Sequence, residues 1–260
     1  MGSLQGQVAV VTGANRGLGA EIAVALAAEG ADLALCAREL STLSGTQAAA
    51  AVHGGRVLAL ECDVTSPKSA DEMARAVLAH YGHVDTVVAN AGLAGPTMLM
   101  HEIGYDAWRE CLAADLDGVF LTLRGFIPSM IGAASGSLIA ISLATGKRPL
   151  QGRTPYAAAK MGVIGLMRSL AVEVGPFGIR ANSVCPGAVN GVRIREVFTA
   201  QAGEFGISEE EVLMRFTGSS ALGRLVEPGE VGAACVFLAS PAASGITGED
   251  LNVSAGLVMF

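Results

Sequence analysis

Short apolar runs alternate with longer amphipathic runs along the whole chain. The apolar runs predict strands at Val8–Val11, Asp32–Cys36, Arg56–Cys62, Thr86–Ala89, Ser137–Ile141, Arg180–Val184 and Asp250–Val253, and the amphipathic runs predict helices near 18–29, 40–52, 67–82, 104–131, 155–175 and 228–239. Almost continuously apolar strands that alternate with helices are typical of a parallel sheet covered on both faces. Because crossovers are right-handed, we expect a doubly wound α/β sheet of the Rossmann type, with about seven strands. No Pro- or Ser-rich linker divides the chain, so residues 1–260 are predicted to form a single domain.

Composition narrows the class of protein. A chain of 260 residues with 51% hydrophobic residues can build a large core. The net charge of −7 argues against nucleic acid and against anionic membrane surfaces as partners. No run approaches the ~18 consecutive apolar residues typical of a membrane span, and the N-terminus lacks the layout of a signal peptide. The five cysteines are scattered and no histidines are spaced as metal ligands, which indicates a reducing cytoplasm and no metal site.

The first predicted strand runs directly into a glycine-rich turn and a helix, VAVVTGANRGLG. Its three glycines are Gly13, Gly17 and Gly19. Glycine lets the backbone approach a ligand closely, and the following helix start presents free N–H groups and a positive dipole end. The spacing is G-x-x-x-G-x-G rather than the commoner dinucleotide fingerprint, and an ordinary turn is the alternative. Between a strand and a helix, the turn favours a nucleotide-binding site.

The end of the second strand indicates which nucleotide. In dinucleotide folds an acidic residue here binds the ribose hydroxyls of NAD, but this chain has Ala37 followed by Arg38. A cation at this place pairs with the 2′-phosphate of NADP, and Arg16 inside the glycine turn could reach the same phosphate. We therefore expect NADP rather than NAD, with two solvated surface arginines as the alternative.

Two further strand ends carry polar or small residues. Asp63 closes the third strand and could accept a hydrogen bond from an adenine amino group, or could cap the next helix in competition with Thr65 and Ser66. Asn90-Ala91-Gly92 closes the fourth strand. The carboxyl ends of parallel strands share one edge of the sheet, where ligands bind in such folds.

Tyr156 and Lys160 form the pair that carries the chemistry. Four residues apart in TPYAAAKMGVIG, they share one face of a helix. A tyrosine side chain ordinarily titrates near pH 10, and a lysine one turn away stabilises the phenolate, which makes the phenol a usable acid–base group. The small apolar neighbours imply a tightly packed helix, in which an unpaired lysine would be costly.

With the glycine turn, Asn90-Ala91-Gly92, the Tyr156/Lys160 pair and Cys185-Pro186-Gly187 in this order, the chain resembles the classical short-chain dehydrogenase/reductase family, over about residues 5 to 256. It is similar to the acyl-carrier-protein reductase and sugar or alcohol dehydrogenase branch. The resemblance implies a homotetramer that transfers hydride between NAD(P) and a carbonyl or alcohol, with Tyr156 as acid–base and Lys160 holding the ribose. It implies a substrate lid at about 190–225. The cofactor site would comprise Gly13, Asn15, Arg16, Gly17, Leu18, Gly19, Arg38, Asp63, Val64, Asn90, Ala91, Gly92, Tyr156, Lys160, Pro186, Gly187 and Val189.

The chain departs from the family pattern at the serine that binds the substrate oxygen. This serine normally lies about thirteen residues before the tyrosine, where the chain has Leu143, with Ser142 next to it. Neighbouring side chains on a regular strand point to opposite faces, so Ser142 can serve only if the strand end bulges or the loop is longer. Ser142 remains the candidate, with Thr145 and Thr154 as substitutes.

A second departure is Asp115, which stands where family members have an asparagine that holds a water beside the lysine; Asp117 fits the spacing less well. An aspartate can also hold water, so Asp115 is a candidate member of the catalytic group. Two milder changes are Gly191 in place of a nicotinamide-binding threonine, for which Asn190 could compensate, and Ala255-Gly256 in place of a double glycine.

The predicted function is an NADP-dependent reductase of a ketone or other small carbonyl compound. A second hypothesis, motivated by Leu143 and Asp115, is a cofactor-binding or regulatory protein without turnover. A third keeps the fold but uses NAD or another reaction, such as alcohol oxidation or the reduction of an activated double bond or an imine.

Overall fold

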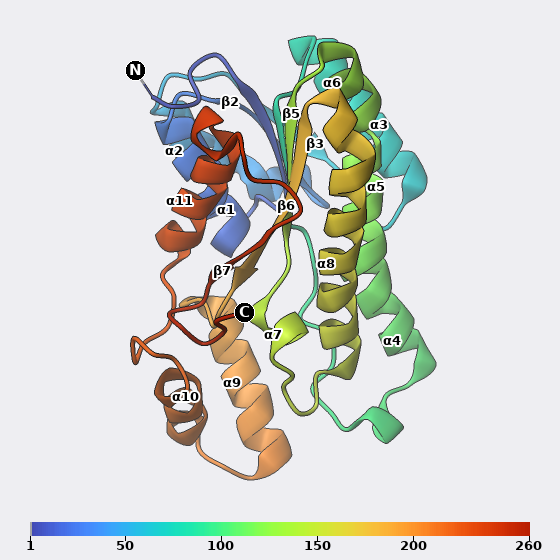
Figure 1. Cartoon of the computed structure of the whole chain (residues 1–260). Helices are drawn as coiled ribbons and strands as arrows, with labels where there is room; N and C mark the ends of the chain where they lie inside the picture. The colour runs from blue at the N-terminus through green and yellow to red at the C-terminus, as the bar shows by residue number, and fades with distance from the viewer. Residues whose placement is uncertain (1) are drawn as a thin grey trace.

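A seven-stranded, wholly parallel sheet forms the centre of the molecule (Figure 1). The computed structural model describes residues 2–260. The strand order is β3-β2-β1-β4-β5-β6-β7. Successive strands are therefore added on one side of β1 up to β3 and on its other side from β4 onward, which confirms the doubly wound prediction. The strands are β1 Val8–Thr12, β2 Asp32–Ala37, β3 Val57–Glu61, β4 Thr86–Ala89, β5 Gly136–Ile141, β6 Ile179–Pro186 and β7 Asp250–Val253.

Helices cover both faces of this sheet. One face carries α3, α5, α6 and α8, and the other carries α1, α2 and α11. The α-helices are α1 Gly17–Ala28, α2 Ser44–Ala51, α3 Pro67–Tyr81, α4 Tyr105–Leu112, α5 Gly118–Arg124, α6 Ile127–Ala133, α7 Ala144–Lys147, α8 Thr154–Val174, α9 Val192–Phe205, α10 Glu209–Gly218 and α11 Pro228–Ala239. Short 3-10 turns lie at Leu40–Leu43, Met100–Glu102, Gly175–Phe177 and Pro241–Ala243.

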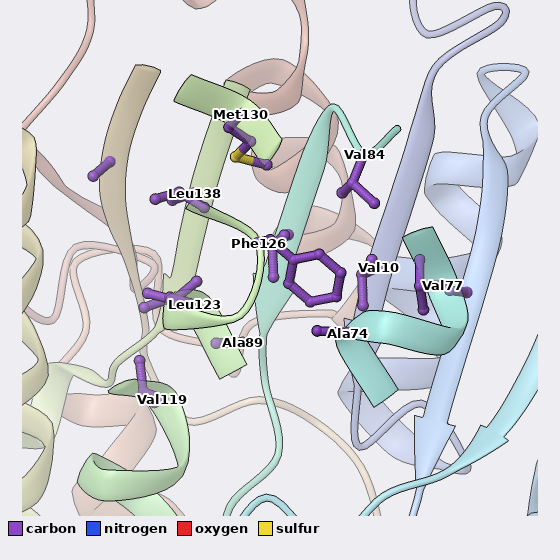
Figure 2. Close-up of a cluster of buried hydrophobic side chains, with 14 of the residues drawn as sticks. Val10, Ala74, Val77, Val84, Ala89, Val119, Leu123, Phe126, Met130 and Leu138 are labelled. Atoms are coloured by element: carbon purple, nitrogen blue, oxygen red, sulfur yellow. The ribbon is translucent and has the colours of Figure 1, made fainter. Parts of the chain in front are cut away.

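Each central strand supplies both layers of the core, because its side chains alternate between the two faces. Val8 and Val10 of β1 pack under α3 and α5, whereas Ala9 and Val11 pack under α1 and α11. Figure 2 shows the first layer, where the fully buried Phe126 ring lies among side chains from β1, α3 and α6. The same alternation decides where the residues just beyond β5 point.

The segment expected as one helix over 104–131 is divided into α4, α5 and α6. A wider π-helical turn, Ala113–Asp117, joins α4 to α5. Such insertions occur mostly as single turns inside α-helices, often at functional sites. The turn carries Asp115 and buries it.

This same helical stretch, Tyr105–Ala133, is long and apolar enough to cross a membrane by length and composition alone, with a mean hydropathy of 1.2. The sequence pattern predicted no such run. In the fold, α5 and α6 place Val119, Leu123 and Met130 in the core, which accounts for the apolar composition.

The carboxyl ends of β1, β4 and β5 lie together at one edge of the sheet, and α9 and α10 extend beyond that edge (Figure 1). These two helices occupy most of the segment 190–225 that was expected as a substrate lid. Helix α10 begins with a capping box in which Ser208 accepts from the Glu211 N–H and Glu211 accepts from the Ser208 N–H.

Candidate active site

Tyr156 and Lys160 lie one turn apart on α8, and both are nearly buried, with 5% and 3% of their surface exposed. Lys160 Nζ lies 5.5 Å from the centroid of the Tyr156 ring. It donates a 3.0 Å hydrogen bond to the carbonyl oxygen of Ile141, the last residue of β5. The strand end therefore fixes the ammonium group beside the phenol.

Asp115 completes a buried cluster with this lysine. Its Oδ1 lies 3.2 Å from Lys160 Nζ, and the side chain is fully buried. Its Oδ2 accepts a 3.2 Å hydrogen bond from the Leu93 N–H. A buried carboxylate is costly unless it is paired with a cation and hydrogen-bonded, and both conditions hold here. Thus the structure brings together Tyr156, Lys160 and Asp115, three of the four residues expected to form the catalytic group.

Ser142, the fourth, does not join them. Its side chain is fully buried, and its Oγ donates a 2.7 Å hydrogen bond to the Lys160 carbonyl oxygen on the α8 backbone. The reason is the alternation along β5, where Leu138 and Ala140 point to the α8 face and Ser142 keeps the same parity. Leu143, half-buried, points the other way. This geometry does not support the expectation that Ser142 binds the substrate oxygen, since its proton is directed to a buried carbonyl oxygen of α8.

Gly92 is necessary for the Asp115 cluster, a reason that the sequence pattern did not reveal. A Cβ at this position would lie 2.3 Å from Asp115 Oδ1 and 3.7 Å from Lys160 Nζ. Cβ atoms in proteins essentially never lie within 3.0 Å of a non-bonded heavy atom, so any larger residue at position 92 would displace the Asp115 carboxylate. Cys111, one helical turn before Asp115, lies 3.8 Å from Oδ2, and burial raises the pKa of its thiol to about 11, with the carboxylate adding to the rise.

The glycine turn has the geometry that a nucleotide-binding turn requires. Gly13 has φ +65°, and a Cβ there would lie 2.9 Å from Ala91 Cα. A Cβ on Gly19 would lie 2.2 Å from the Gly13 carbonyl oxygen. The side chain of Asn90 donates to the Thr12 carbonyl oxygen at 2.9 Å, and thereby ties the end of β4 to this turn. Gly13 and Gly19 therefore permit close packing of the turn against itself and against the end of β4, whereas Gly17, with φ +57° and open space around a Cβ, is exposed.

Arg16 and Arg38 lie at the two expected places, at the start of α1 and just beyond β2, and both are exposed. Within residues 2–260 neither arginine takes part in an ion pair. Their charges are therefore free to meet a ligand that lies along the turn. Asn15 and Leu18, which flank Arg16, are half-buried in the same turn.

Asp63 does not cap α3. Its Oδ1 accepts hydrogen bonds from the Thr65 N–H at 2.9 Å and from the Thr65 hydroxyl at 2.8 Å. Ser66 is the N-cap and accepts from the Ser69 N–H. Asp63 is thus part of a local turn beside Val64, which packs against Gly118. The capping alternative is excluded, and the adenine-binding role stays a prediction.

The segment after β6 carries Gly187, Val189 and Asn190, and the contact that Asn190 makes differs from the expected one. A Cβ on Gly187, which follows Pro186, would lie 3.0 Å from Ser254 Cα, so this glycine permits close packing against the chain beyond β7. Val189 pairs with Val226 in an isolated parallel bridge. The Asn190 amide, expected to compensate for the missing threonine, instead donates to the Glu227 carboxylate at 3.2 Å. This ion–dipole contact fixes the base of the segment 190–225.

Two arginines near Tyr156 were not predicted from the sequence. The Cζ of Arg153 lies 4.8 Å from the Tyr156 ring centroid, and the Cζ of Arg193 lies 6.0 Å from it. Arg153 precedes the tyrosine by three residues, a helical spacing that could have drawn attention to it. Arg193 comes from α9, far along the chain, and no local pattern connects it to the site.

Comparison with known proteins agrees with this fold. The family profile described as enoyl-(acyl carrier protein) reductase matches residues 13–258. A granaticin polyketide synthase putative ketoacyl reductase of Streptomyces violaceoruber is 37% identical over 96% of this chain and 92% of its own length. A 3-oxoacyl-(acyl-carrier-protein) reductase of Vibrio cholerae is 34% identical over 99% of this chain and all of its own. The crystal structure of an actinorhodin polyketide ketoreductase variant with NADPH superposes with a TM-score of 0.93 at 32% identity, with both chains fully covered.

A doubly wound sheet with a glycine turn after β1 and these relatives define an oxidoreductase of the Rossmann type. The chain belongs to the short-chain dehydrogenase/reductase family.

Proposed function

We propose that the protein is an NADP-dependent reductase of a ketone or a related small carbonyl compound. The observation that carries the proposal is the buried Tyr156/Lys160 pair, neutralised by Asp115, at the strand edge that also holds the glycine turn. General acid–base catalysis needs a proton donor positioned at the reacting group, and burial strengthens the interaction between that donor and a neighbouring charge. Tyr156 can be this donor, and Lys160 is the neighbouring charge.

The residues present fit NADP. Gly13 and Gly19 let the turn pack closely against the end of β4, Gly17 leaves open space beside its backbone, and the start of α1 follows with N–H groups that suit a pyrophosphate. At the end of β2, where an acidic residue would favour NAD, the chain has the small Ala37 and then the exposed Arg38. Among the similar structures, the actinorhodin ketoreductase variant is a complex with NADPH, whereas a xylitol dehydrogenase, at TM-score 0.94 and 25% identity over 97% of this chain and 99% of its own, is a complex with NAD⁺.

The chain's own residues then divide the work. When bound, the nicotinamide supplies hydride to the carbonyl carbon. The Tyr156 hydroxyl donates its proton to the carbonyl oxygen, and the Lys160 ammonium group beside the ring stabilises the phenolate that is left. Asp115 and the Ile141 carbonyl oxygen hold that ammonium group in place. In the opposite direction, the same phenolate would accept a proton from an alcohol.

A second candidate function is a cofactor-binding protein without turnover. It is favoured by one observation, the replacement of the family's substrate-binding serine by Leu143 while Ser142 is turned toward α8. Loss of one hydrogen-bond donor to a developing oxyanion typically costs on the order of a hundredfold or more in rate, which slows an enzyme without abolishing its activity. We therefore favour the enzyme.

We further propose that the protein acts in the cytoplasm as a homotetramer. Phe120 on α5 and Met161 and Val172 on α8 are large apolar side chains with about half or more of their surface exposed. Apolar side chains exposed on neighbouring helices favour burial against another copy. Sedimentation of the purified protein across a concentration series measures the assembly directly.

The reductase proposal is tested by NADPH oxidation with a panel of ketones, aldehydes, imines and activated alkenes, with NADH in parallel. The expected result is turnover of a ketone with NADPH preferred. Turnover of no compound, with NADPH bound normally, would favour the second function, and a large preference for NADH would refute the role given to Arg16 and Arg38.

A further inference from the structure

A second charge cluster lies next to the catalytic pair and is not used by the chemistry described above. Arg153, the residue before α8, has only 4% of its surface exposed. Its guanidinium group donates to the Thr97 hydroxyl at 3.0 Å, to the Gly95 carbonyl oxygen at 3.3 Å and to the Ala94 carbonyl oxygen. These are three hydrogen bonds from a group that carries five N–H donors, and all three acceptors are neutral.

Burial lowers the pKa of Arg153, the tyrosine opposes this effect, and the nearby Arg193 lowers it further. Arg193 is the second residue of α9 and is exposed. Neither arginine is paired with a carboxylate in residues 2–260. The two guanidinium groups approach the same aromatic ring from different elements, the residue before α8 and the first turn of α9.

The charge around the Tyr156 ring is therefore unbalanced. Three cations, Arg153, Lys160 and Arg193, lie within 6.0 Å of its centroid. One carboxylate, Asp115, neutralises Lys160. The chain as a whole is acidic, with a net charge of −7, so this local excess of positive charge runs against its composition. Burying a guanidinium group without a counter-ion is costly, and an anionic ligand would recover that cost.

The phosphates of a nucleotide have a binding place of their own, because the glycine turn and the α1 start suit a pyrophosphate, whereas Arg153 is bonded to the segment 94–97. We propose that Arg153 and Arg193 bind a carboxylate of the substrate, and that the substrate is a free oxo acid rather than an ester or thioester. Planar guanidinium groups match carboxylates with paired N–H donors, which a neutral ester cannot use as well. The inference rests on the proposed reductase function and names its substrate class.

The test compares short and medium-chain oxo acids with their methyl esters as substrates of the intact protein with NADPH. The expected result is a kcat/KM at least about tenfold higher for each acid than for its ester, the magnitude of one charge-assisted hydrogen bond. Arg193→Gln should raise KM for the acids about tenfold and leave the esters unchanged. Arg153→Gln should act in the same direction, and Arg153→Lys should restore part of the preference.

The variants also separate binding from other roles. Arg195 lies on α9 two residues after Arg193 and is exposed. Arg195→Gln is therefore the matched control, and it should keep the preference for acids. If Arg153→Gln and Arg193→Gln lower kcat equally for acids and esters, the arginines act on the tyrosine or on folding and the inference is overturned. The same holds if the wild-type protein prefers the esters.

If no compound is turned over, the proposed reductase function fails, but the anion site can still be tested by a binding measurement. Titration calorimetry with NADPH present compares an aliphatic carboxylate with its carboxamide. Tighter binding of the carboxylate, lost in Arg193→Gln and kept in Arg195→Gln, supports the anion site. Equal binding of the two ligands, or carboxylate binding that Arg193→Gln leaves intact, contradicts it.

Discussion

Ser142→Ala tests the orientation of the strand end beside the catalytic pair. The Ser142 hydroxyl donates a 2.7 Å hydrogen bond to the Lys160 carbonyl oxygen from a fully buried position. Removing a buried neutral hydrogen bond costs about 0.5–1.5 kcal/mol. For a chain of this size the corresponding fall in Tm is about 2–4 °C per kcal/mol. We expect Tm to fall by a few degrees and kcat/KM to change by less than about threefold, because the donor faces α8 and not the substrate.

Ser137→Ala is the matched control. Ser137 lies at the other end of β5, is buried, and donates a 2.9 Å hydrogen bond to the Leu238 carbonyl oxygen. The two variants should therefore lose similar stability, which urea unfolding and thermal melts measure, and both should keep NADPH-dependent turnover. If Ser142→Ala alone lost about a hundredfold or more in kcat/KM, which is typical of a lost oxyanion donor, Ser142 would be the substrate-binding serine and our account of β5 would be refuted.

Three further predictions concern the supports of the site. Gly92→Ala should lower Tm by several degrees and strongly reduce turnover, since its Cβ would lie 2.3 Å from Asp115 Oδ1, whereas Gly165→Ala, with open space around its Cβ, should do neither; equal melting curves for the two variants would contradict this. Arg16→Ala and Arg38→Ala should each raise the Kd for NADPH about tenfold or less and leave NADH binding unchanged, and a parallel loss for both nucleotides in calorimetry would show that the charges do not recognise the phosphate. The five buried cysteines, whose thiol pKa values burial raises, should react with iodoacetamide at pH 8 only after unfolding in urea, because the thiolate form that reacts is scarce in the folded protein; rapid labelling of the native protein would be the opposite outcome.

Hydrophobic periodicity was sufficient to predict the sheet, because the central strands β1, β2, β4 and β5 are buried along almost their whole length and contain few polar residues. Six of the expected strands differ from the observed ones by at most one residue at either end, and β6 is longer at both ends. The helix over 104–131 was predicted as continuous, since a single inserted residue in a π turn leaves the apolar pattern on both sides intact. The π turn is evident only in the folded structure, where α4 packs against α8 and α5 packs against α3 and β4.

The part of the candidate site that depends on the spacing of nearby residues in the sequence was predictable. The contacts between residues that are distant in the sequence were not. Tyr156 and Lys160 follow from helical geometry, and the alternation along β5 already indicated that Ser142 and Leu143 face opposite ways. The pairing of Asn190 with Glu227, by contrast, joins residues 37 positions apart through a loop whose path no pattern specifies. Arg193 reaches the Tyr156 ring in the same way, from a helix beyond the edge of the sheet.

The most direct test of the central claim compares the wild-type protein with Tyr156→Phe in NADPH binding and NADPH oxidation. The phenyl ring keeps the packing of the buried tyrosine and removes only the proton donor. We predict that the variant binds NADPH with an unchanged Kd and loses at least about a hundredfold in kcat with a ketone that the wild type reduces. Turnover by Tyr156→Phe at the wild-type rate would contradict the account.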